Sequence, residues 1–378
     1  MRRDAELDSA TGLPTGARPA PAVTLIGRRR DRAANPSPSV PQGRAVKAIS
    51  IVAGIAGLTA ITALVAYFGA GAVIRPLLAI GWSGFSVICL IQLVLISVMG
   101  IAWRALAPGV AAWVFPWGRL MRDAGSEVLP LSQMGGCILG ARAVAIAGVP
   151  NSIAAATTIV DLTLEFLAKL VYTALGLILL VRLRPASPVA LPVTVGLATA
   201  GLLAVALVIV QRRGFDLFDR FARVLGRGWA DRTAAGAAAV HLALDRIHRR
   251  KAGLRVGFAL HLGCWIAGAA QAWIALSLAG SPLDFSAVLV IESLVYAIRT
   301  LSFAIPNSVW VQEGAYLLLG ATFGLTPEMT LALSLLKRAR DLAIGLPALG
   351  IWQAVEGGRL WRRKLATAGN GTNPRQES

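Results

Sequence analysis

Four charged residues lie within five positions of an apolar stretch near the end of the chain: Lys337, Arg338, Arg340 and Asp341. A charge at the centre of a membrane-spanning helix costs about 2.5–3.5 kcal/mol on insertion scales, so such charges usually face a partner, a polar cavity or a substrate. Asp341 lies four residues after Lys337 and three after Arg338, so pairing within one helix can neutralise part of the charge. One carboxylate cannot neutralise three cations, so a further acidic partner or an anionic ligand is required.

Other charged residues in apolar segments are candidates for the same site. Arginine suits the phosphate of a lipid headgroup, because its planar fork donates two hydrogen bonds and stays charged in apolar surroundings. A buried carboxyl group can cap backbone amides, bind a headgroup amine or carry a proton. For every one of these residues, the alternative to ligand binding is an ion pair within the protein that serves only the structure. The candidate substrate-binding residues are Arg142, Asp161, Glu165, Glu292, Arg299, Glu313, Lys337, Arg338, Arg340 and Asp341.

The composition predicts the helices that must position these groups. The 378 residues are 56% hydrophobic and 15% charged, and the apolar residues come in long runs. Apolar runs of about 18 residues or more are typical of membrane-spanning helices. The sequence therefore predicts an all-α, polytopic transmembrane bundle with about seven or eight spans. The predicted spans are 48–72, 85–107, 153–181, 190–210, 256–279, 285–304 and 331–352, with the short segments 131–148 and 307–324 between them.

The net charge of +18 is concentrated outside the apolar runs. Residues 1–47 are predicted to form a disordered basic tail, 211–255 a basic loop, and 357–378 a second basic tail. Loops rich in Lys and Arg stay on the cytoplasmic side, where anionic lipids attract them, so we expect a cytoplasmic N-terminus and no binding of nucleic acid. An amphipathic helix within 215–229 is predicted to lie on the membrane surface or against the spans.

The two halves of the apolar region repeat one plan. Pro130 precedes Gly148 by 18 residues, and Pro306 precedes Gly324 by the same number. This spacing predicts an internal repeat of about 176 residues, with halves 48–210 and 256–356, each containing a short segment that re-enters or crosses the membrane. Re-entry of both gives seven crossings, whereas a second segment that crosses gives eight and places the basic C-terminal tail inside, as the charge rule favours.

The chain between 110 and 125 combines aromatic and basic residues. Trp113, Phe115 and Trp117 alternate with Arg119 and Arg122. Indole rings and arginine stems both settle at the membrane–water boundary, so we expect an interfacial helix here.

Sequence motifs of common enzymes are absent from the chain. It contains no G-x-S-x-G elbow, phosphate-binding G-x-x-x-x-G-K-[ST] loop or H-E-x-x-H pair. Its three cysteines and three histidines have no metal-ligand spacing. We therefore expect no catalytic activity, no metal and no cofactor.

Several short motifs resemble the lysylphosphatidylglycerol synthase transmembrane, or flippase-like, family, over about residues 48–356. The motifs that carry this resemblance are Ile305-Pro306, Gln312-Glu313-Gly314, Phe323-Gly324-Leu325 and Lys337-Arg338. The branch associated with hopanoid biosynthesis is similar at Leu129-Pro130, Gly135-Gly136, Arg142, Asp161 and Gly350-Ile351-Trp352-Gln353. Ser308 and Trp310 stand where the family usually has glycines.

The resemblance implies a bacterial inner-membrane protein that moves or handles a lipid. The expected partners are membrane lipids with anionic headgroups, hopanoids among them, together with hopanoid biosynthesis enzymes or a second copy of the chain. Two other functions remain open: a scaffold that holds lipid enzymes without transporting anything, and a membrane enzyme that modifies a lipid.

Overall fold

The computed structural model of the protein describes residues 70–127, 133–186, 188, 191–202, 205, 209, 239–301 and 311–369. Within these ranges the chain forms helices and their connections and contains no strand, which confirms the predicted all-helical fold for this part of the chain. Residues 48–69 of the first predicted span and the amphipathic helix predicted within 215–229 lie outside the described residues.

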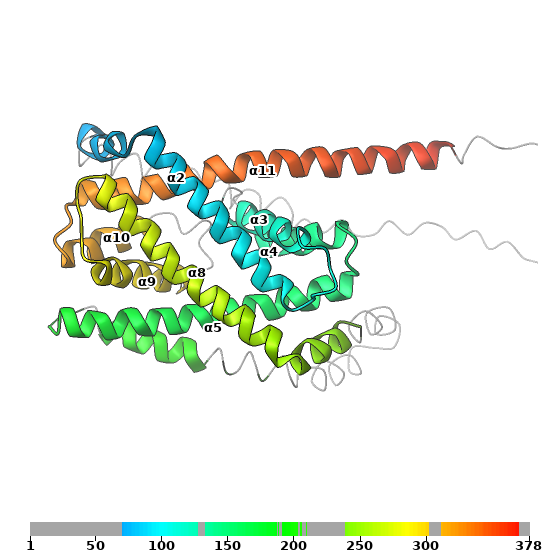
Figure 1. Cartoon of the computed structure of the whole chain (residues 1–378), viewed down its shortest axis with the longest axis horizontal. Helices are drawn as coiled ribbons and strands as arrows, with labels where there is room; N and C mark the ends of the chain where they lie inside the picture. The colour runs from blue at the N-terminus through cyan, green and yellow to red at the C-terminus, as the bar shows by residue number, and fades with distance from the viewer. Residues whose placement is uncertain are drawn as a thin grey trace, which may run out of the picture. The chain divides into compact units, whose positions relative to one another are not determined.

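Eight labelled helices carry the fold (Figure 1). They are α2 (Ala70–Arg104), α3 (Val114–Glu127), α4 (Gln133–Ile146), α5 (Asn151–Leu183), α8 (Lys251–Leu278), α9 (Phe285–Leu301), α10 (Val311–Thr322) and α11 (Pro327–Gly369). Two further helices cover residues 191–202 and 239–249.

Three of the described helices are long and apolar enough to cross a membrane: Leu78–Arg104 within α2, α5, and α8. Their lengths of 27, 33 and 28 residues exceed the about 20 residues that a hydrocarbon core of about 30 Å requires. Each overlaps a predicted span. The predicted spans at 285–304 and 331–352 overlap α9 and α11, which do not meet these criteria within the described chain.

The two predicted short segments contain the short helices α4 and α10. They have 14 and 12 residues, so they rise about 21 and 18 Å, less than the hydrocarbon thickness. Both end in the same way. Gly148 and Gly324 have positive φ angles of 104° and 82°, and the next residue donates its N–H to a carbonyl five positions back. A glycine in this conformation closes the last turn of each helix.

A long helix follows each short one. Proline precedes the first residue of α5 at position 150 and is the first residue of α11 at position 327, where its missing N–H costs no hydrogen bond. At the start of α11 the Thr326 hydroxyl accepts a hydrogen bond from the Met329 N–H at 3.3 Å, which satisfies one of the free amides.

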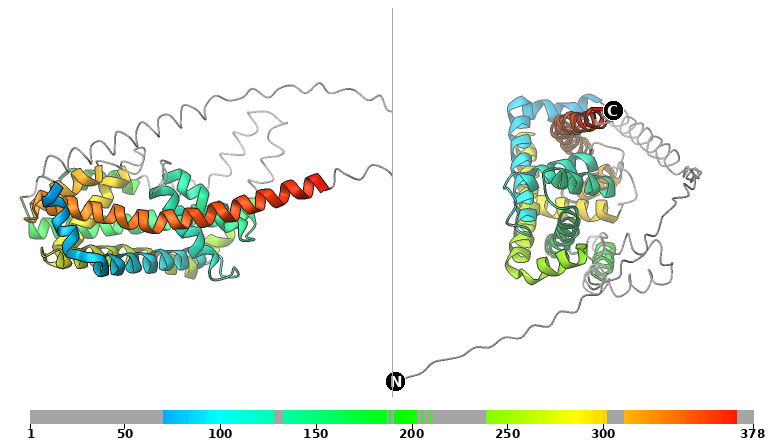
Figure 2. Two further views of the ribbon diagram at one scale, coloured as in Figure 1. Left: turned by 90° about the horizontal axis from the view of Figure 1, so that it is seen from above. Right: turned by 90° about the vertical axis from the view of Figure 1, so that its right-hand side faces the viewer.

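The helices pack in a pattern that is unchanged when α2, α3, α4 and α5 are exchanged with α8, α9, α10 and α11. In the first set α2 packs on α3, α3 on α4 and α4 on α5, and the second set makes the corresponding contacts. Between the sets, α5 packs on α8 and α9, while α11 packs on α2 and α3 (Figures 1 and 2). The contact between α2 and α8 joins the first helix of each set, so the exchange leaves it unchanged.

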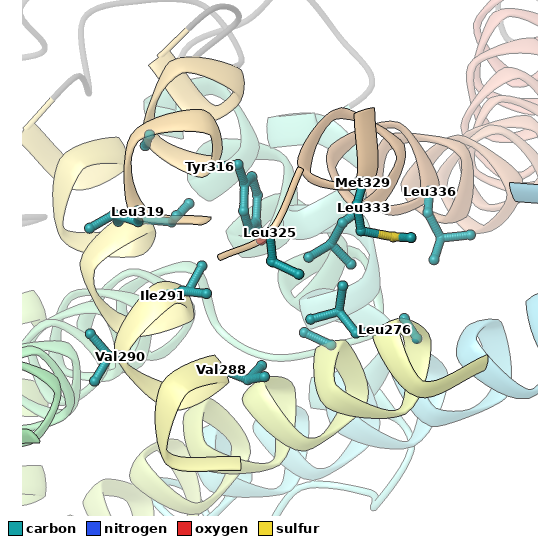
Figure 3. Packing of buried hydrophobic residues seen from close by; sticks show 14 of the residues in the cluster. Leu276, Val288, Val290, Ile291, Tyr316, Leu319, Leu325, Met329, Leu333 and Leu336 are labelled. Carbon is teal, nitrogen blue, oxygen red and sulfur yellow. The ribbon is translucent and has the colours of Figure 1, made fainter. Parts of the chain in front are cut away.

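Close helix approach and an apolar core hold the two sets in place. A Cβ atom on Gly140 of α4 would lie only 2.9 Å from the Gly118 carbonyl oxygen of α3, so α3 and α4 meet backbone to backbone. Leu276, Ile291 and Leu319 belong to a buried cluster to which α8, α9, α10 and α11 contribute (Figure 3). This packing fixes α9 and α10 against α11, where most of the charged residues of the second set lie.

Candidate functional site

Two arginines of α3 bind two carboxylates of α5. Arg119 Nη1 donates to Glu165 Oε2 at 2.8 Å. Arg122 Nη1 donates to Asp161 Oδ2 at 2.8 Å, and its Nη2 donates to Glu165. All four side chains are buried. Asp161 and Glu165 are four residues apart and therefore share one face of α5, as their spacing predicts.

Further polar groups extend this network. Lys169 Nζ lies 3.1 Å from Glu165 Oε1, and Asp123 lies 3.0 Å from Arg119 Nε. Burial raises the pKa of the Asp123 carboxyl in α3, although Arg119 and Arg122 oppose the rise. His261 of α8 is fully buried, with its Nε2 atom 2.9 Å from Asp161 Oδ1.

The second helix set holds its charges in a similar way. The Tyr316 hydroxyl donates to Glu292 Oε1 at 2.7 Å, and Lys337 Nζ binds Glu292 Oε2. The Lys337 ammonium also lies 5.4 Å from the ring centres of Tyr296 and Tyr316, close enough for attraction between the cation and the aromatic faces. Glu292 is fully buried, so this pair is removed from solvent.

The remaining charges of α11 also have acidic partners. Arg338 Nε donates to Glu313 Oε1 at 2.7 Å, and Arg340 Nη2 donates to Asp341 Oδ1 at 2.7 Å. Arg340 Nη1 additionally donates to Gln271 of α8 at 2.7 Å. The sequence requires an acidic partner or an anionic ligand for the cations near 337, and the structure supplies one carboxylate for each of the three.

A polar pocket of about 260 Å³ lies among α2, α3, α4, α5, α8, α9 and α11, so both helix sets line it. Five cationic and four acidic side chains face it: Arg119, Arg122, Lys169, Arg299, Arg340, Asp123, Glu127, Glu165 and Asp341. Two buried hydrogen-bond donors in its lining, Arg299 Nε and Trp265 Nε1, have no partner among the described residues. Orphaned buried donors are uncommon and are satisfied when a ligand or water supplies acceptors. The pocket therefore has one more cationic than acidic side chain in its lining, and two of its residues keep a donor without a partner.

Comparison with known proteins assigns no family to the chain. No family model, curated protein or solved structure matches it.

The structure separates the ten sequence-predicted site residues into four groups. Glu165, Arg299, Arg340 and Asp341 line the pocket. Asp161 lies directly behind it, because its partner Arg122 is part of the lining. Glu292, Glu313, Lys337 and Arg338 form ion pairs among α9, α10 and α11 and do not line the pocket. Arg142 is exposed and binds Glu356 of α11.

Sequence reasoning missed two central members of the site, Arg119 and Arg122. The predicted helix is present as α3, but both guanidinium groups are buried among protein carboxylates rather than placed along a membrane surface. The physical reason is that Asp161 and Glu165 lie opposite them and satisfy their donors. The two arginines are three residues apart, which places them on one side of α3. This spacing is the sequence signal for the site, because it matches the four-residue spacing of Asp161 and Glu165 on α5.

Proposed function

We propose that this chain is a multi-pass membrane protein that binds the polar headgroup of a lipid in the charged pocket and moves or passes on that lipid. The observation that carries the proposal is a charged pocket with two unpartnered donors, placed among helices whose length and composition suit a membrane. Charged groups are expensive in a bilayer, so a cavity lined by charged side chains inside a helical bundle points to a function.

The lining favours a headgroup that is rich in hydrogen-bond acceptors, such as a phosphate. Arg299 binds Glu127 through Nη2 at 2.9 Å, and its buried Nε–H has no partner among the described residues. The buried indole N–H of Trp265 in α8 has none there either. The paired charges hold each other in fixed positions without a ligand, so the pocket is already formed. Its volume of about 260 Å³ is slightly smaller than that of small-molecule sites, about 300–1,000 Å³, which suits a headgroup.

The proposal includes the internal repeat and the topology that the sequence predicts. The exchange symmetry of the packing and the matching ends of α4 and α10 support two related halves with the pocket between them. Transporters built from repeats commonly hold their substrate at such an interface, near broken or short helices. We further propose seven or eight spans, a cytoplasmic N-terminus and a location in the bacterial inner membrane, in keeping with the charge distribution.

The resemblance to the flippase-like family supports lipid movement as the outcome of headgroup binding. A polar headgroup needs a charge-lined route across the bilayer while its tail stays in hydrocarbon. The pocket supplies such surroundings for part of that route. A hopanoid or a hopanoid precursor with a polar headgroup is the substrate that the hopanoid branch of the family suggests.

The proposal is tested by measuring lipid movement between leaflets. The full chain is reconstituted into liposomes containing phosphatidylglycerol labelled on its acyl chain with a dithionite-sensitive fluorophore. We expect the wild-type protein to expose inner-leaflet label faster than protein-free liposomes do. Arg299→Gln is expected to slow this movement about tenfold, the effect of losing one charged hydrogen bond.

The matched control is Arg142→Gln, because Arg142 is an arginine of an ion pair outside the pocket. It should leave lipid movement at the wild-type rate. Equal slowing by both variants, or wild-type liposomes that behave like protein-free ones, would contradict the proposal; the second result is what a scaffold predicts. A labelled lipid recovered with a changed mass would indicate an enzyme instead.

A further inference from the structure

An apolar groove of about 450 Å³ lies beside the polar pocket. It is formed by α5, the helix at 191–202, α9 and α10. Its lining is almost wholly apolar and includes Leu170, Val193, Leu197, Ala200 and Ile298. The groove therefore offers a ligand almost only apolar contacts, whereas charged side chains face the polar pocket.

The groove and the pocket share lining residues. Phe166 and Lys169 of α5 and Thr300 of α9 line both. Lys169 shows how the two chemistries meet within one side chain. Its ammonium lies 3.1 Å from Glu165 Oε1 and 4.7 Å from the Trp265 ring centre, both of which line the pocket. Long amphipathic side chains commonly place an apolar stem along apolar surface and a charged end in polar surroundings.

We infer that the groove holds an apolar chain of the same lipid whose headgroup occupies the polar pocket, with Lys169 at the junction of the two. This inference rests on the proposed function and adds a binding site for the apolar part of that lipid, a hydrocarbon chain joined directly to the headgroup. The shared residues place the two spaces next to each other, and a molecule that fills both must change from polar to apolar at Lys169. Burial of its chain is favourable in proportion to the apolar area removed from water.

Bulk lipid is the competing occupant, since any apolar surface of a membrane protein contacts acyl chains. Exposed leucines on the same helix provide the comparison. Leu191 and Leu202 are each 74% exposed and do not line the groove, whereas Leu197 and Val193 do. If the groove holds the chain of a bound lipid, contact with the groove depends on binding of that lipid's headgroup in the pocket. Surrounding lipid contacts the exposed positions whatever the state of the pocket.

The test uses the full chain in liposomes that contain phosphatidylglycerol with a light-activated diazirine near the end of one acyl chain. After illumination, crosslinked peptides are quantified by mass spectrometry for the wild type, Lys169→Gln and Arg299→Gln. We expect crosslinks at Leu170, Val193 and Leu197 in the wild type. Both variants should reduce them about tenfold, as expected for losing one charged contact, while crosslinks at Leu191 and Leu202 stay constant.

The outcomes separate this inference from the proposed function. Groove crosslinks that persist in Arg299→Gln and Lys169→Gln, or that are missing from the wild type, would overturn the inference. If Arg299→Gln still slows lipid movement in either case, headgroup binding stands and only the chain site is lost. If Arg299→Gln leaves lipid movement unchanged, the proposed function fails as well. A substitution that fills the groove with a larger side chain gives an independent check. Ala200→Leu should reduce groove crosslinks and leave those at Leu191 unchanged.

Discussion

Glu165→Gln is expected to lower the free energy of unfolding by about 3–5 kcal/mol, because it removes the one carboxylate that Arg119, Arg122 and Lys169 share. Removing one partner of a buried ion pair leaves an uncompensated charge in surroundings that solvate it poorly. A glutamine keeps the shape of the side chain but offers one neutral acceptor to three cations. The change is measured as the shift in unfolding midpoint of the purified chain, followed by tryptophan fluorescence.

Glu356→Gln is the matched control for this substitution. Glu356 pairs with Arg142, whose side chain is 57% exposed, so solvent screens the interaction. Loss of this ion pair should lower the free energy of unfolding by no more than about 1 kcal/mol. Equal destabilisation by the two substitutions would contradict the view that the α3–α5 ion pairs hold the pocket together.

The second large effect is expected at Glu292 and Lys337. Glu292→Gln alone should destabilise the protein by about 3–5 kcal/mol, because the Lys337 ammonium loses its carboxylate in a fully buried position. Combining Glu292→Leu with Lys337→Met should recover most of that stability, since replacing both members of a buried pair by apolar groups is often neutral. Unfolding midpoints of the single and double variants test this.

The double variant also tests whether this pair is structural. Neither residue lines the polar pocket, so a stable double variant should move labelled lipid at the wild-type rate. A double variant with wild-type stability and no lipid movement would show that the pair contributes directly to function. In that case the candidate site would have to extend from the pocket to this ion pair between α9 and α11.

Local spacing in the sequence predicts part of the fold and of the site. The apolar runs predict α5 and α8 to within a few residues of each end, because membrane-spanning helices have a fixed minimum length. The four-residue spacing of Asp161 and Glu165 predicts that they share one face of α5, and both bind arginines there. The cations near position 337 are predicted to require a further acidic partner or an anionic ligand, and in the structure Glu292 and Glu313 are acidic partners of Lys337 and Arg338.

The partners of buried charges could not be predicted where they lie far apart in the sequence. Arg122 meets Asp161 across 39 positions, and His261 meets Asp161 across 100. No local period links such residues, because only helix packing brings them together. Tryptophan and arginine on α3 fit an interfacial helix equally well. Arg142 illustrates the reverse case: its apolar surroundings suggest a buried charge, yet it lies exposed beside Glu356.

The most direct test of the central claim is to count the lipid that stays in the pocket after purification. The full chain is purified from membranes in mild detergent and analysed intact by native mass spectrometry, as wild type, Arg299→Gln and Arg142→Gln. We predict that the wild type and Arg142→Gln each retain about one phosphate-containing lipid per chain and that Arg299→Gln loses it, because one pocket offers one headgroup site. Equal retention by all three proteins, or none by the wild type, would contradict lipid binding in the pocket.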